Sequence, residues 1–86
     1  MNFIHYPLSA GNNNVIQVIL TDWANVQLLD EANYQNYING GKYIYYGGYA
    51  EVSPFNIRPP YFNNNWHLII DKGGYTGSVK ASVKVI

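Results

Sequence analysis

The chain has 86 residues, enough for one domain, and no cysteine, so a hydrophobic core rather than disulfides must stabilise the fold. Charged residues make up only 12% of the sequence, with five basic residues balancing five acidic ones. This composition offers no basic patch for nucleic acid or for an anionic membrane surface. No stretch approaches the ~20 apolar residues of a membrane span, and the first residues lack a signal-peptide pattern. We therefore expect a cytoplasmic, water-soluble protein.

The first third of the chain predicts three strands. Residues 3–8 are a short extended segment in which Pro7 favours a sheet edge or a strand end. After a turn rich in glycine and asparagine, the β-branched run at residues 15–21 indicates a buried central strand. Residues 26–30 form the third strand. We expect the second and third strands to pair as a hairpin.

Residues 30–39 predict one or two turns of helix. Asp30 is a suitable N-cap residue, and the pair Gly40-Gly41 supplies a stop. Three apolar or aromatic side chains would share one face of this helix, at the i, i+3 and i+4 spacing: Tyr34, Tyr37 and Ile38.

Three extended segments follow the predicted helix. Residues 42–46 form a strand that breaks at Gly47-Gly48, with Tyr43 and Tyr45 on the same face. Residues 49–52 and 55–58 are short extended pieces, punctuated by proline.

The C-terminal part predicts a second hairpin. Residues 66–71 and 78–86 are strands separated by a glycine-rich turn. In the last strand, buried and exposed positions alternate with period 2. The expected inward side chains are Val79, Ala81, Val83 and Val85, and the expected outward ones are Lys80, Ser82 and Lys84.

Taken together, these elements predict an all-β fold. We expect a small antiparallel β-sandwich or partly open barrel of six to eight short strands, with at most one short helix. Residues 1–86 show no linker or internal repeat, so a single β-sandwich domain is predicted.

The sequence carries no recognisable catalytic or metal-binding pattern. His5 and His67 are the only histidines, and neither belongs to a nucleophile motif. His67 and Asp71 share a strand face but lie about 13 Å apart along the strand, too far for a dyad. The carboxylates fall at strand ends and turns, where capping explains them. We expect no enzymatic activity, no metal and no cofactor.

The glycine-rich turn has a second interpretation. It lacks the spacing of a nucleotide-binding loop and precedes a strand, so a hairpin turn is the simpler interpretation. Its backbone amides, with one lysine, would otherwise form an anion-binding nest. The residues of that nest are Lys72, Gly73, Gly74 and Gly77.

The tyrosines offer the better ligand-binding hypothesis. Six of the nine lie between residues 34 and 49. An aromatic shelf with nearby amide and guanidinium groups would suit a sugar or a nucleobase. The alternative is that these phenols close the ends of the sandwich. The predicted ligand-binding residues are Tyr43, Tyr45, Arg58, Trp66 and His67.

A set of short motifs runs along the chain from end to end: residues 1–6 (MNFIHY), 26–30 (VQLLD), 45–48 (YYGG), Ser53-Pro54, Trp66-His67, Asp71, residues 73–75 (GGY), Gly77 and residues 81–83 (ASV). In these motifs the chain resembles an uncharacterised family of short bacterial β-sandwich domains, found alone or N-terminal to TIR domains.

The resemblance implies a β-sandwich and a sensing role linked to TIR-type bacterial immune signalling. It supplies no catalytic or ligand-binding residues. The expected function is therefore a non-enzymatic binding or sensing module for an unidentified small polar ligand or protein partner. The alternative is a protein-interaction or self-association module, a homo-oligomer that uses an exposed strand edge.

Overall fold

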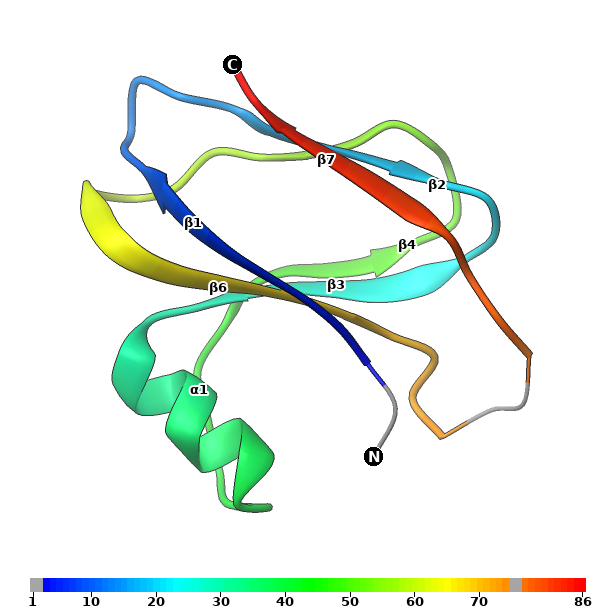
Figure 1. Cartoon of the computed structure of the whole chain (residues 1–86), viewed down its shortest axis with the longest axis horizontal. Coiled ribbons are helices and arrows are strands. Elements are labelled where there is room, and N and C mark those ends of the chain that lie inside the picture. Colours follow the sequence, from blue (N-terminus) through cyan, green and yellow to red (C-terminus); the bar gives the residue numbers. More distant parts are fainter. Residues whose placement is uncertain (1–2, 75–76) are drawn as a thin grey trace.

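The computed structural model describes residues 3–74 and 77–86, which form seven strands and one helix (Figure 1). In chain order the elements are β1 (Ile4–Ala10), β2 (Ile16–Leu20), β3 (Ala24–Leu29), α1 (Glu31–Ile38), β4 (Tyr46–Ala50), β5 (Phe55–Ile57), β6 (Asn63–Asp71) and β7 (Ala81–Val85). The strands make two antiparallel sheets, in the orders β1-β6-β3-β4 and β5-β2-β7. The predicted small β-sandwich is confirmed.

The hydrophobic core lies between the two sheets and is built by alternate side chains of each strand. Its largest fully buried members are Ile16, Val18, Val26, Leu28, Trp66, Leu68 and Ile70. The predicted alternation in β7 is also present: Val79, Ala81 and Val83 pack against this core, while the intervening polar side chains are exposed. Val85, at the end of the strand, is 38% exposed, so it lies at the margin rather than inside.

Neither predicted hairpin forms. β2 pairs with β5 and β7, whereas β3 pairs with β4 and β6, so the short turn after β2 crosses from one sheet to the other. β6 and β7 likewise belong to different sheets. A turn sequence predicts that the chain reverses direction. It does not predict whether the next strand joins the same sheet or the opposite one.

The strand predicted at residues 42–46 is also wrong. Residues 41–45 are irregular, and β4 begins at Tyr46 and runs through both glycines, which pair with Gln27 and Val26. A Cβ on Gly47 would lie 2.3 Å from the carbonyl oxygen of Val26. The glycine therefore permits close approach of an edge strand here rather than ending it.

Helix α1 begins and ends where the sequence predicts. The Asp30 carboxylate accepts a 2.8 Å hydrogen bond from the amide of Asn33, which caps the N-terminus. At the other end, Gly40 has φ +77°, and the amides of Gly40 and Gly41 donate to the carbonyls of Tyr37 and Asn36. This pair of bonds is a Schellman motif, which requires a residue that tolerates the left-handed conformation.

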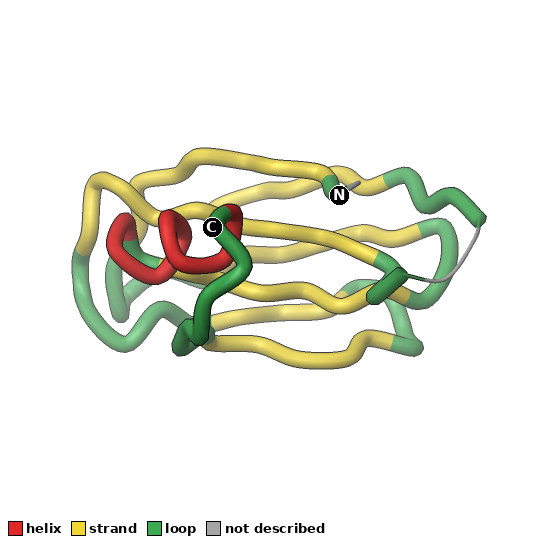
Figure 2. The backbone as a smooth tube through the Cα atoms, turned by 90° about the horizontal axis from the view of Figure 1, so that it is seen from below, coloured by secondary structure: helices red, strands yellow, loops and turns green. Residues whose placement is uncertain are grey.

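The helix covers part of the outer face of the four-stranded sheet. In Figure 2, seen from below, it lies in front of the strands. Tyr37 packs with Leu29 and Ile69 in a second, smaller cluster flanked by Phe3, Tyr34 and Tyr43. Ile38, predicted on the same face, is 42% exposed. In the described part of the chain, no helix has the length and apolarity needed to cross a membrane.

Candidate functional site

The outer face of the four-stranded sheet collects the polar side chains of otherwise apolar strands. In β3, the side chains of Ala24, Val26 and Leu28 enter the core, so Asn25 and Gln27 point to the opposite face. The same alternation places His5 of β1, and His67 and Asp71 of β6, on this face. Two polar sites result, one on each side of the contact between α1 and the sheet.

The first site is a groove of about 940 Å³ at the end of the sandwich where β6 leaves the sheet. Its polar side chains come from three elements, from the segment before β4 and from the turn after β6: Asn25, Gln27, Tyr37, Tyr43, Asp71, Lys72 and Ser78. Its apolar side chains are Phe3, Ile4, Ile70 and Val79. A large concave surface with a few converging polar groups is the usual form of a ligand site.

Asp71 organises the polar half of this groove. One carboxylate oxygen, Oδ1, accepts from the Asn25 side-chain amide at 3.0 Å and from the Gly73 backbone amide at 2.9 Å. The other, Oδ2, accepts from the Tyr37 hydroxyl at 2.8 Å. Burial and this hydrogen bond to a carboxylate raise the pKa of Tyr37 far above its ordinary value. Tyr37 is therefore a donor to Asp71 throughout the physiological pH range.

A second pair of side chains extends the polar surface. The Tyr43 hydroxyl lies 3.4 Å from Oε1 of Gln27, and its ring meets the Tyr37 ring edge-on at 5.1 Å. Gln27 is only 9% exposed. Its amide is thus held in position at the floor of the groove, with one donor group that a ligand can use.

The second site is a chain of hydrogen bonds between His5, His67 and Glu31. Nε2 of His5 lies 2.8 Å from Nδ1 of His67, whose Nε2 lies 2.7 Å from a carboxylate oxygen of Glu31. The Tyr34 ring stacks on His67 at 4.0 Å, with the ring planes 2° apart. The chain joins β1 and β6 to the first turn of α1.

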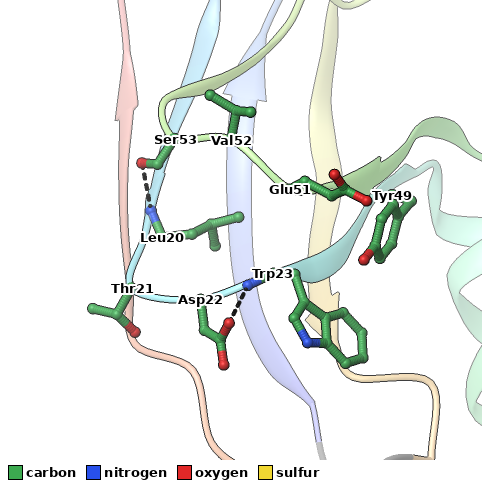
Figure 3. A pocket seen from close by; sticks show the side chains of 8 residues that line it. All are labelled: Leu20, Thr21, Asp22, Trp23, Tyr49, Glu51, Val52 and Ser53. Atoms are coloured by element: carbon green, nitrogen blue, oxygen red, sulfur yellow. Dashed lines mark hydrogen bonds between the residues drawn. The ribbon is translucent and has the colours of Figure 1, made fainter.

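A smaller pocket of about 390 Å³ lies at the turn between β2 and β3 (Figure 3). Its aromatic residues are Trp23 and Tyr49, with ring centroids 5.7 Å apart. Lys72, which lines the larger groove, contacts two residues of this pocket: its amine is 4.0 Å from the Trp23 ring centroid and 2.9 Å from Oδ2 of Asp22. That bond and the Trp23 backbone amide lower the pKa of Asp22. The lysine already covers the indole, so this pocket is a weaker ligand site than the groove.

The structure separates the five predicted ligand-binding residues. Tyr43 lines the groove. Tyr45 is 43% exposed, and its ring centroid lies 5.9 Å from that of Tyr43. Arg58 follows β5 in the other sheet, where it donates to the carbonyl of Asn12. His67 belongs to the histidine chain, where its ring stacks on Tyr34.

The structure corrects the prediction that Trp66 binds ligand. It is 0% exposed in the core, and its indole N–H donates to the carbonyl of Ala10 at 3.0 Å. Its position in the middle of β6 faces the opposite sheet, so it cannot contribute to a surface shelf.

Two groups of the predicted anion nest have partners within the protein. Gly73, Gly74 and Gly77 do line the groove, although residues 75–76 of this turn lie outside the described structure. The Gly73 amide is engaged by the carboxylate of Asp71, and the Lys72 amine points to Asp22. The carboxylate of Asp71 therefore competes with an anion for the Gly73 amide.

Several residues of both sites were not identified from the sequence. Asn25 and Gln27 interrupt a buried strand at alternate positions, which is a detectable signal of a polar outer face. Glu31 and Tyr34 become relevant only once α1 is placed on the sheet. Among the described residues, no three histidine, aspartate or glutamate side chains converge as metal ligands would.

Comparison with known proteins places the chain in a family. No curated protein and no solved structure matches it significantly. A family model described as a domain of unknown function, DUF1883, matches residues 1–86. The chain therefore belongs to the DUF1883 family, an uncharacterised domain family, as its resemblance to such domains indicates.

Proposed function

We propose that this domain is a non-enzymatic recognition module that binds a small polar ligand in the groove beside α1. The observation that carries the proposal is the convergence of amide, phenol and carboxylate groups from separate elements on one concave surface. These groups hold one another in place through the bonds of Asp71 with Asn25 and Tyr37. A preorganised site of this kind loses little conformational entropy on binding.

The chemistry of the groove favours a neutral ligand that carries hydroxyl or amide groups. Gln27 and Asn25 offer amides, and the rings of Tyr37 and Tyr43 offer apolar faces. Asp71 is an acceptor, which disfavours phosphate groups at the same place. A sugar or an isolated nucleobase meets these requirements, and a nucleic-acid strand does not, because Lys72 is the one basic residue among the described lining of the groove and its amine is bonded to Asp22.

The test is a titration of the isotopically labelled protein with mono- and oligosaccharides and with nucleosides. A ligand should shift the NMR signals of the Asn25 and Gln27 side chains and of the Gly73 amide. Gln27→Leu should weaken binding by about tenfold, as expected for one lost hydrogen bond. Gln17→Leu, on β2 in the other sheet, is the matched control. Absence of shifts with every compound, or equal binding by Gln27→Leu, would contradict the proposal.

We further propose a sensing role in a cytoplasmic bacterial system, in which a TIR domain gives the response. The resemblance to domains that precede TIR domains supports this role, and so does the preorganised polar groove. The domain would then detect the ligand, and a TIR domain, in the same chain or in a partner, would act. Fusion to a TIR domain should make the activity of the fusion depend on Gln27.

Self-association is the second candidate function. β7 lies at the edge of the three-stranded sheet, and Val85 and Ile86 are 38% and 55% exposed beside it. An open edge with apolar side chains can add a strand from a second copy. Sedimentation of the wild type and of a Val85→Lys variant distinguishes the two functions, since only self-association predicts a dimer that the lysine disrupts.

A further inference from the structure

The Glu31–His67–His5 chain lies outside the groove and is held in an unusual arrangement. The two imidazole planes are inclined by 22° and their centroids are 5.0 Å apart, so the rings meet nearly edge to edge along the hydrogen bond. Tyr34 covers both rings from the helix side, with centroids 4.0 Å from His67 and 4.7 Å from His5. The side chain of His67 is only 12% exposed.

This chain satisfies every bond both with no added proton and with one. With both imidazoles neutral, His67 donates from Nε2 to Glu31 and accepts at Nδ1 from His5. With one added proton, His67 donates from both nitrogens, to Glu31 and to Nε2 of His5. A second added proton leaves an N–H on each side of the 2.8 Å gap, and two positive charges face each other.

We propose that this chain is a proton-sensitive latch, which holds α1 on the sheet while the histidine pair carries at most one added proton and releases it when both imidazoles are charged. The bond between the imidazoles joins β1 to β6, and the bond to Glu31 joins β6 to α1. Electrostatic repulsion between the two charged imidazoles therefore separates the two rings on which Tyr34 is stacked.

The groups around the two imidazoles do little to offset the positive charge that the second proton adds. From α1, Glu31 is the one carboxylate in contact and Tyr34 is a neutral phenol. From β3, the residue opposite His67 is the apolar Leu29. Among the described residues, one carboxylate thus faces two imidazoles, and its side chain is 55% exposed to solvent, which screens it. Partial burial and the neighbouring His67 lower the pKa of His5, while Glu31 acts in the opposite direction.

Release of α1 has a consequence for the groove, and this consequence rests on the proposed function. Tyr37, one turn along the helix from Tyr34, forms a wall of the groove and donates to Asp71. Movement of α1 removes that wall. Ligand affinity should therefore fall at the same pH at which the helix is released.

The experiment follows the imidazole and backbone NMR signals of the wild-type domain between pH 7.5 and 5. Charging of the second imidazole should coincide with shifts of the amides of residues 31–38 and with a severalfold loss of their hydrogen-exchange protection, after correction for intrinsic rates. If docking of α1 lowers the pKa of an imidazole by one unit, charging that imidazole changes the ratio of docked to released helix tenfold.

Variants separate the latch from a general effect of acid. His5→Asn keeps a polar side chain but cannot gain a proton, so the acid-induced loss of protection in α1 should disappear. Lys84→Gln, on β7 of the other sheet, is the control and should retain it. The proposal is overturned if the α1 amides stay protected while both wild-type imidazoles become charged, or if His5→Asn loses protection as the wild type does. These measurements need no ligand, so they decide on the latch whether or not the groove binds one.

Discussion

The hydroxyl of Tyr37 lies 2.8 Å from Oδ2 of Asp71, a bond that fastens the last turn of α1 to the last residue of β6. Tyr37 is 5% exposed, and the same carboxylate accepts bonds from Asn25 and from the backbone of Gly73. The bond therefore links the helix, the sheet and the turn that together shape the groove.

Tyr37→Phe should destabilise the domain by about 2 kcal/mol, because a buried bond to a charged acceptor is lost while the ring remains. Urea denaturation measures the change. Tyr45→Phe is the control: Tyr45 is 43% exposed, and its hydroxyl removal should cost less than about 0.5 kcal/mol. Equal stability of the two variants would show that the hydroxyl of Tyr37 does not hold the helix.

Periodicity along single strands was sufficient to predict the fold class. The alternation of valines with lysines in β7 and the apolar run of β2 depend only on neighbouring residues, and so does the cap at Asp30. Each of these local features is present in the structure. They identify strands, faces and the helix, which is enough to predict a sandwich.

Pairing between strands was not predictable in the same way. β2 and β3 are adjacent in sequence yet lie in different sheets, because the choice between a hairpin and a crossing turn depends on core packing across the whole domain. The partners in the histidine chain are even more remote, with His5 and His67 separated by 62 positions. Trp66 illustrates the opposite error: a residue type common in binding sites serves here as a core side chain.

Gly47→Ala tests the close approach of β4 to β3. Gly47 has φ +123°, and an added Cβ would lie 2.3 Å from the Val26 carbonyl oxygen. The strained backbone and the clash should together cost at least about 2 kcal/mol in unfolding free energy. Gly41→Ala meets only an ordinary contact of 3.6 Å and should be nearly neutral. A Gly47→Ala variant as stable as Gly41→Ala would mean that the edge strand does not pair as described.

Lys72→Met tests the contact of the lysine amine with Trp23 and Asp22. Lys72 is 9% exposed, and methionine keeps most of its apolar stem. We expect a loss of about 1 kcal/mol from the cation–π contact, measured by thermal or urea unfolding. Lys80→Met, an exposed lysine before β7, should have a smaller effect.

The same variant changes the acid dependence of stability. Because the pKa of Asp22 is lowered from 3.8 in the folded state, its contribution is present above that value and is lost as the pH falls further. Without the lysine the pKa of Asp22 should rise toward its ordinary value. The stability of Lys72→Met should therefore decline less steeply below pH 4 than that of the wild type, and an unchanged slope would assign the lowered pKa to the Trp23 amide alone.

The two tryptophans allow the core and the surface to be observed separately. Trp66 is fully buried, whereas Trp23 is partly exposed beside the smaller pocket. In Trp23→Phe, the remaining fluorescence should be emitted at short wavelength and resist acrylamide quenching; in Trp66→Phe, it should be red-shifted and readily quenched. Trp66→Phe should also lose about 2–3 kcal/mol, since the Ala10 carbonyl loses its donor and the smaller ring leaves a void. Equal quenching of both variants would place Trp66 at the surface and contradict the packing of the two sheets around it.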